Sequence, residues 1–216
     1  MAILWSLSVD NLQTIAALLA GVLSILAFNC YVRDVLSGVA KPEKACWLIW
    51  SVLGAISFAS QAYEGASPAL IFVGVQVGAT MLVASLSMRW GYGKFFTERN
   101  LWIFILASAG LLAWAATDNS ANALAISIGI SLLGGIRTIK KAFHDPDSES
   151  GRSWWMCFAA SVFAVISVGA LEPILLAYPL YLLVLYSSIL IALNMGLARE
   201  RWKQSSLCDP DGLTPA

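Results

Sequence analysis

Residues 28–50 read FNCYVRDVLSGVAKPEKACWLIW, and residues 132–155 read LLGGIRTIKKAFHDPDSESGRSWW. In both stretches an apolar run ends at an arginine, a proline follows that arginine after nine residues, and a tryptophan pair opens the next apolar run. Arg33 and Pro42 take these places in the first stretch, and Arg137 and Pro146 take them in the second. The pattern predicts that the chain passes from one apolar helix to the next in the same way twice.

Seven apolar runs near the length of a membrane-spanning helix make up most of the chain. Such a helix needs about 20 apolar residues, with a range of roughly 17–25. The runs cover residues 12–31, 45–63, 68–88, 101–117, 121–136, 153–171 and 173–197. The fourth and fifth are short, so one re-entrant hairpin is an alternative to two crossings. A hairpin would put Asp118 inside the bilayer, which is costly unless the carboxylate is buried and paired, and we therefore expect seven crossings.

The charged residues predict how these helices are oriented. Only 12% of the residues are charged, about half the share of a soluble domain, which is roughly 25%. All 13 basic residues follow the first, third, fifth or seventh run. They are Arg33, Lys41, Lys44, Arg89, Lys94, Arg99, Arg137, Lys140, Lys141, Arg152, Arg199, Arg201 and Lys203. Because loops inside the cell attract Lys and Arg, we expect a cytoplasmic C-terminus and an N-terminus outside.

The first run is expected to be an uncleaved anchor. A signal peptide carries positive charge before its apolar run, whereas here Asp10 precedes the run and Arg33 follows it. The expected location is therefore a cell membrane that the chain crosses several times, most simply a bacterial inner membrane. The net charge is zero, and without a basic face we expect no nucleic-acid partner. The four cysteines are scattered with no CxxC spacing, which predicts small apolar side chains and not a disulfide or a metal site.

An internal repeat is predicted on either side of the fourth run. Arg33, Pro42 and Trp47 match Arg137, Pro146 and Trp154, with offsets of 104, 104 and 107 residues. Two three-helix units with one helix between them are parallel, related by an axis along the membrane normal. We therefore expect a first half at 1–100, a linker helix at 101–120, a second half at 121–202 and a disordered cytoplasmic tail at 203–216.

These features resemble the PQ-loop and SWEET-like superfamily of seven-helix membrane proteins, which share the 3 + 1 + 3 count and this orientation. In that family a Pro-Gln pair lies near the inner end of the first helix of each half, followed by a basic residue, a short loop and an aromatic-rich second helix. The basic residue, loop and aromatic start are similar here. The Pro-Gln pair is absent, with Asn29-Cys30 and Leu133-Gly134 at its two places. The chain also resembles bacterial membrane proteins of similar size with Trp-rich and Asp-Pro loops.

Neutral polar residues inside the apolar runs are the candidate solute site, because such residues mark pathways through membrane proteins. Gln76 and Thr80 are four residues apart and share a helix face. Gln76 is near mid-helix, where the resemblance implies substrate-binding side chains from the third and seventh helices, with Tyr186 as its counterpart. Asn29 and Ser187 complete the candidate set. The competing interpretation is hydrogen bonding between helices, and for Gln76 the two stand about even.

Two roles are open for the tryptophans expected at the inner membrane interface. Trp47, Trp50, Trp154 and Trp155 fit an aromatic belt, and an inner gate is the sharper alternative. Gly134-Gly135 and Pro179 could soften their helices, although glycine also serves close packing.

The sequence as a whole predicts a small carrier that moves a neutral or weakly polar solute by alternating access, with no cofactor and no metal. The expected partners are the lipid bilayer and that solute, and a homo-oligomer stays open. The first alternative is a receptor or accessory module of the same fold. The second is an intramembrane enzyme, which the lack of acids, bases and metal ligands within the apolar runs argues against. A retinal protein is excluded because the seventh run has no lysine.

Overall fold

The computed structural model describes residues 2–65, 69–94, 120–169 and 172–208, together with positions 101, 102, 105, 108, 109 and 112. This part of the chain is all helical, with one isolated backbone bridge between Glu43 and Tyr92 and no strand. The helices are α1 (Ala2–Leu36), α2 (Lys44–Glu64), α3 (Ala69–Trp90), α5 (Ser120–His144), α6 (Gly151–Val168) and α7 (Pro173–Cys208), with a 3-10 turn η1 (Pro146–Ser148) between α5 and α6. The helix expected over 101–117 lies mostly outside the described residues, and its six described positions are helical.

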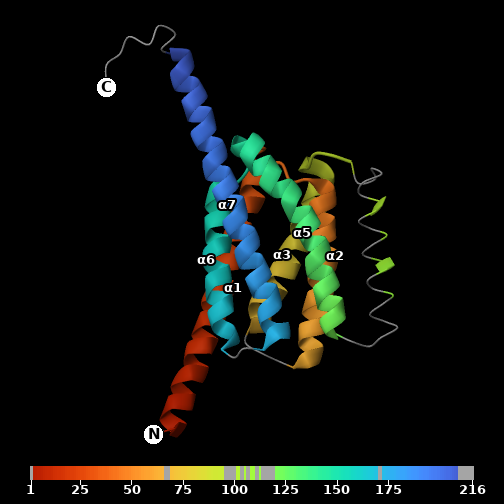
Figure 1. Ribbon diagram of the computed structural model, residues 1–216, viewed down its shortest axis with the longest axis vertical. Coiled ribbons are helices and arrows are strands. Elements are labelled where there is room, and N and C mark those ends of the chain that lie inside the picture. Colours follow the sequence, from red (N-terminus) through yellow and green to blue (C-terminus); the bar gives the residue numbers. More distant parts are fainter. Residues whose placement is uncertain are drawn as a thin grey trace.

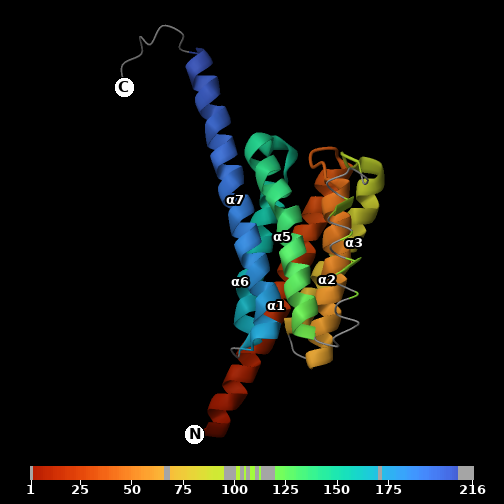
Figure 2. The same cartoon turned by 45° about the vertical axis from the view of Figure 1, so that its right-hand side comes forward.

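The helices form one upright bundle (Figures 1 and 2). In both views α1, α3, α5 and α7 run in one direction, and α2 and α6 run in the other. The most extensive packing links α1 to α6, α6 to α7, α7 to α5, α5 to α2, α2 to α3 and α3 back to α1. The six described helices therefore close a ring, and every one of them has an inward face.

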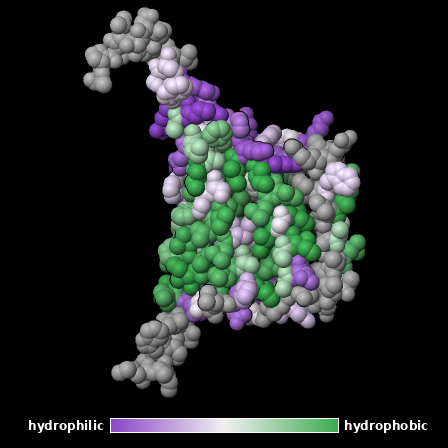
Figure 3. Space-filling view, in the orientation of Figure 1, coloured by the Kyte–Doolittle hydropathy of each residue, from purple (hydrophilic) through white to green (hydrophobic). Residues whose placement is uncertain are grey.

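Apolar side chains cover much of the outside of this ring. Leu18, Val22 and Ile25 on α1 are all more than half exposed, whereas Ala16, Ala20 and Ala27 on the same helix are buried. Within the described residues, five helices are long and apolar enough to cross a membrane, namely α1, α2, α3, α6 and α7. Figure 3 shows a green apolar band across the visible face and a purple hydrophilic rim along its upper edge. An apolar surface of this extent indicates a membrane protein.

The hydrophilic rim is the end of the bundle at which α1, α3 and α5 finish and α2 and α6 begin (Figure 1). We call it the basic end, since Arg33, Arg89 and Lys141 lie in the last turns of α1, α3 and α5, which finish there. Glu43 starts α2 at this end, where its carboxylate accepts a hydrogen bond from the main-chain N–H of Cys46 at 3.2 Å. A carboxylate at a helix N-terminus satisfies a free N–H group and opposes the positive helix end.

Several helix ends differ from the expected runs, and those of α6 and α7 have a local reason. α6 stops at Val168, three residues early, because Gly169 takes a left-handed conformation with φ of 68° and ends the helix. α7 continues to Cys208, so residues 203–208 are helical and not disordered as expected. Ion pairs from Glu200 to Arg199 at 2.8 Å and to Lys203 at 3.4 Å support this part of α7. Residues 209–216 of the expected tail lie outside the described residues.

Candidate functional site

The ring encloses a small cavity to which all six helices contribute. Its volume is about 30 Å³, room for about two water molecules. The lining residues are Phe28 and Tyr31 of α1, Trp47 and Trp50 of α2, Gln76 and Thr80 of α3, Ser131 of α5, Ser153, Trp154 and Cys157 of α6, and Tyr178, Tyr181, Leu182, Leu185 and Tyr186 of α7. None of these side chains is charged.

Aromatic rings form most of the wall and contact one another around it. The ring of Trp47 lies with its centroid 4.9 Å from that of Tyr31 and 5.3 Å from that of Trp50. Trp154 lies 5.9 Å from Tyr31 on one side and 5.9 Å from Tyr186 on the other. The tilted and edge-on angles of these pairs are those that aromatic quadrupoles favour. A continuous aromatic chain therefore links α2, α1, α6 and α7 across the cavity.

The one side-chain amide in this wall is that of Gln76. Its Nε2 donates a hydrogen bond to the hydroxyl of Tyr186. Its Oε1 is buried, and neither it nor the buried hydroxyl of Tyr181 has a hydrogen-bond partner among the described residues. A buried polar atom without a partner is costly, so Gln76 offers a free acceptor to whatever enters the cavity.

The candidate residues divide between the cavity and other places. Gln76, Thr80, Tyr186, Trp47, Trp50 and Trp154 line the cavity. Thr80 donates its hydroxyl to the carbonyl of Val77 in its own helix, at 3.0 Å. Asn29 is exposed on α1, and Ser187 donates its hydroxyl to Leu183 of its own helix at 2.7 Å. Trp155 is 54% exposed on the outside of α6. Asn29, Ser187 and Trp155 therefore do not belong to the cavity wall.

Sequence reasoning did not identify several wall residues, above all the tyrosines at the start of α7. Tyr178, Tyr181, Leu182, Leu185 and Tyr186 follow one another at intervals of three, one, three and one residues. This spacing places them along one face of a helix. The helical spacing of these tyrosines in the sequence could have predicted that this face of α7 points inward. Phe28, Tyr31 and Ser153 carried no comparable signal in the sequence.

Gly134 and Gly135 of α5 mark close packing against the wall. A Cβ atom at Gly134 would lie 3.2 Å from Nε1 of Trp50, and one at Gly135 would lie 2.5 Å from Cδ1 of Leu185. The indole of Trp50 donates to the carbonyl of Ser131 at 3.2 Å, one turn earlier in α5. The missing side chains thus allow α2 and α7 to approach α5, which favours the packing interpretation of this pair over a hinge.

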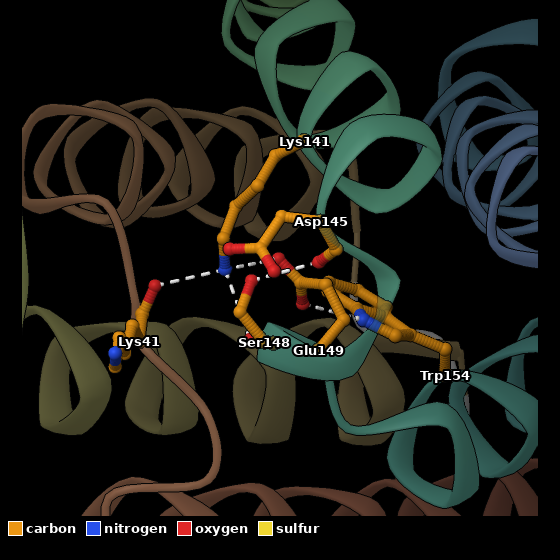
Figure 4. Close-up of polar contacts among 6 residues, drawn as sticks. All are labelled: Lys41, Lys141, Asp145, Ser148, Glu149 and Trp154. Carbon is orange, nitrogen blue, oxygen red and sulfur yellow. Dashed lines mark hydrogen bonds and ion pairs between the residues drawn. The ribbon is translucent and has the colours of Figure 1, made fainter. Parts of the chain in front are cut away.

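A polar layer covers the cavity at the basic end, where the segment 37–43 meets the segment 145–150. Arg137 pairs with Glu43 at 3.3 Å, and Lys141 pairs with Glu149 at 2.6 Å. The second oxygen of Glu149 accepts from the indole N–H of Trp154 at 2.9 Å. Figure 4 shows Lys141 reaching across to both Lys41 and Ser148. This layer ties the cavity wall, through Trp154, to the loops above it.

Tyr92 lies at the edge of the same layer. Its main chain bonds to both sides of Glu43, through Pro42 at 3.1 Å and Lys44 at 3.2 Å. The ammonium of Lys141 lies 5.4 Å from the centre of its ring. Burial, and then the charge of Glu43, raises the pKa of Tyr92 to about 12. The phenol therefore stays un-ionised at neutral pH, and the polar layer gains no further negative charge from it.

Comparison of the chain with protein-family models, with curated proteins and with solved structures gives no match.

Proposed function

We propose that this chain is a small membrane carrier of the 3 + 1 + 3 type, which moves a neutral or weakly polar solute by alternating access between two three-helix bundles. The observation that carries the proposal is the uncharged cavity at the centre of the ring, to which both bundles contribute and where Gln76 keeps a free acceptor. In carriers built from parallel repeats, the solute site lies between the repeats near mid-membrane.

The helix packing supports two equivalent halves. Exchanging α1 with α5, α2 with α6 and α3 with α7 turns each packed pair of the ring into another packed pair. For example, α1 against α6 becomes α5 against α2, and α2 against α3 becomes α6 against α7. Exchanged helices also run in the same direction (Figure 1). This pattern is what an axis parallel to the bundle produces.

Two hydrogen bonds between the halves support the same relation at the level of atoms. Cys46 of α2 donates its thiol to the carbonyl of Gly134 of α5, at 3.4 Å. Ser153 of α6 donates its hydroxyl to the carbonyl of Ala27 of α1, at 2.8 Å. Both donors and both acceptors differ by the same 107 residues (153 − 46 and 134 − 27). Trp47 and Trp154, which follow the donors, share this offset and both line the cavity.

The proposal includes the orientation of the chain. Positive charge gathers at loops inside the cell, so the basic end faces the cytoplasm, the N-terminus lies outside and the C-terminus inside. The membrane is a cell membrane, and the lipid bilayer surrounds the exposed apolar side chains of α1 and its neighbours. No catalytic role and no cofactor form part of the proposal.

The size of the cavity favours a second candidate. A volume of about 30 Å³ is too small for most solutes, since binding pockets measure about 300–1,000 Å³. For a carrier, the structure then corresponds to a closed state that must widen to bind. For a receptor or accessory module of the same fold, the tight interior would simply be the core, and Gln76 would serve only packing.

Replacing Gln76 separates the two. Purified protein is screened by thermal shift against neutral sugars, amides and nucleosides, and the compounds that stabilise it are tested for uptake into proteoliposomes. We expect Gln76→Leu to abolish both the stabilisation and the uptake, because the solute loses the amide that orients it in an otherwise uncharged wall. Gln61→Leu is the matched control, since Gln61 is also fully buried but does not line the cavity.

Two results would count against the carrier. Binding that survives in Gln76→Leu with only a lower melting temperature would assign Gln76 to packing. The absence of uptake for every compound that stabilises the wild-type protein would favour the receptor or accessory module.

A further inference from the structure

We propose that Lys141 is a latch that holds the cavity closed at the basic end, with Glu149 as its carboxylate and Trp154 as the part of the cavity wall that it positions. The purpose of the latch rests on the proposed carrier function. The latch itself is a physical arrangement that can be tested without any solute.

The ammonium of Lys141 uses all its hydrogen-bonding capacity between the two loops. Its three acceptors are the carbonyl of Lys41 at 2.9 Å, the carbonyl of Ser148 at 3.0 Å and Oε1 of Glu149 at 2.6 Å (Figure 4). An ammonium group has three donors, so none is left over. The main chains also meet directly, where the N–H of Lys41 donates to the carbonyl of Ser148 at 3.3 Å. One side chain therefore fastens segment 37–43 to segment 145–150.

Glu149 carries this fastening to the cavity. Its Oε2 accepts from the indole of Trp154 at 2.9 Å, while Oε1 holds Lys141. The ring of Trp154 lies 5.9 Å from that of Tyr186, and the hydroxyl of Tyr186 accepts from Gln76. Consecutive direct contacts thus run from the loops to the amide of Gln76 in the cavity.

Because the ion pair of Lys141 and Glu149 is buried, it is either intact or fully separated, with no stable arrangement in between. The side chains of Glu149 and Lys141 are only 2% and 11% exposed. Separating two buried charges without water is very costly, so the loops can part only when water enters and solvates both groups. Glu43 and Arg137 form a second, looser pair at 3.3 Å, with exposures of 17% and 18%. The Lys141 pair is therefore the contact whose breaking should most increase opening.

Cys157 provides a reporter already present in the wall. It is buried and lines the cavity on the turn after Trp154. In a background with Cys30→Ser, Cys46→Ser and Cys208→Ser, it is the one remaining thiol. Protein in lipid nanodiscs is treated with a charged methanethiosulfonate reagent, and modification of the Cys157 peptide is followed by mass spectrometry. The rate measures how often the cavity opens to water.

We expect Lys141→Gln and Glu149→Gln each to raise this rate about tenfold or more, because either change removes the charge attraction from the closed state alone. Glu149→Gln keeps an amide oxygen for Trp154, so it isolates the ion pair from the positioning of the indole. Lys140→Gln is the matched control. It removes the same charge from the next residue of α5, and the ammonium of Lys140 has no partner among the described residues. Size-exclusion profiles and melting curves establish that each variant is folded.

A disulfide tests the direction of opening. In the same background, Lys41→Cys with Ser148→Cys joins the two loops where their main chains are hydrogen-bonded. Oxidation should lower the Cys157 rate at least about tenfold, and reduction should restore it. The idea is wrong if folded Lys141→Gln and Glu149→Gln react as slowly as Lys140→Gln, or if the disulfide leaves the rate unchanged. Where neither neutral variant folds, the disulfide alone decides.

Failure of the carrier gives a different result. If Gln76→Leu leaves solute binding intact while Lys141→Gln still increases the Cys157 rate, the latch stands and the solute site is misplaced. If the Cys157 rate does not respond while Gln76→Leu abolishes uptake, the carrier stands and Lys141 is a structural staple.

Discussion

The two loops at the basic end take corresponding places in the chain but are built differently. In the loop between α1 and α2, Glu43 divides its carboxylate between the N-terminus of α2 and Arg137. In the loop between α5 and α6, Glu149 is buried and gives its oxygens to Lys141 and Trp154. The first loop chiefly starts a helix, whereas the second couples a charge to the cavity wall. Similar halves can therefore contribute unequally to one mechanism.

Removing each carboxylate should give the largest contrast. We expect Glu149→Ala to lower the free energy of unfolding by about 3–5 kcal/mol, because Lys141 would be left buried without its charge partner. Glu43→Ala should cost only about 0.5–2 kcal/mol, the range of a lost helix cap. Unfolding titrations of both variants in mixed detergent micelles measure the difference. Equal losses would mean that the two carboxylates contribute equally to the free energy of unfolding.

Close main-chain approaches near each loop should give intermediate effects. A Cβ at Gly91 would lie 2.6 Å from the carbonyl oxygen of Pro42 in the first loop, and one at Gly196 would lie 2.7 Å from that of Phe143 beside the second. Backbone cannot move aside as a flexible side chain can, so Ala at either position should cost about 1–3 kcal/mol. Gly129→Ala is the control, since nothing lies within 4 Å of its added methyl. The same unfolding titrations apply, and losses no larger than the control's would refute the close approach.

The two equivalent hydrogen bonds between the halves should give the smallest contrast. Ser153→Ala should cost about 0.6 kcal/mol, typical of such bonds between membrane helices. Cys46→Ala should cost less for its hydrogen bond, because a thiol is a weak donor. Cys46→Ser restores a hydroxyl at the corresponding place, and its stability should be close to that of the wild type. A larger loss for Cys46→Ser than for Cys46→Ala would show that size, and not hydrogen bonding, decides at this position.

The apolar runs predicted the middle parts of the described helices well and their ends poorly. α5 continues from the expected end at 136 to His144, and α7 continues from 197 to Cys208. Hydropathy falls where the bilayer ends, but main-chain hydrogen bonds continue into water. The change of repeat offset from 104 to 107 arises in the second loop, because five residues lead from Pro42 to Trp47 whereas eight lead from Pro146 to Trp154. The 3-10 turn η1 takes up part of this longer segment before α6 begins at Gly151.

The type of a residue and its position along a helix predicted part of the candidate site, but not which side chains face the cavity. Gln76 and Tyr186 were chosen because they are polar residues in the middle parts of the third and seventh runs, and the structure brings them into contact. Ser187 and Trp155 adjoin wall residues, but successive residues of a helix point about 100° apart. Which of two neighbours faces inward depends on the packing of the whole ring. The contact of Lys141 with Glu149 joins a helix to a loop and has no signature in either segment.

Because α7 is long, a small rotation near its start moves its far end by a large distance. Its 36 residues span about 54 Å at 1.5 Å per residue, while a bilayer core is about 30 Å thick. Pro179 lies buried near the start of this helix and removes one of its hydrogen bonds. Ser206 lies 27 residues further on, about 40 Å along the axis. A rotation of about 10° at Pro179 would thus swing Ser206 by about 7 Å. A spin label at Ser206 would therefore report a rotation at Pro179 that moves the residues of the cavity wall much less, since they lie closer to Pro179.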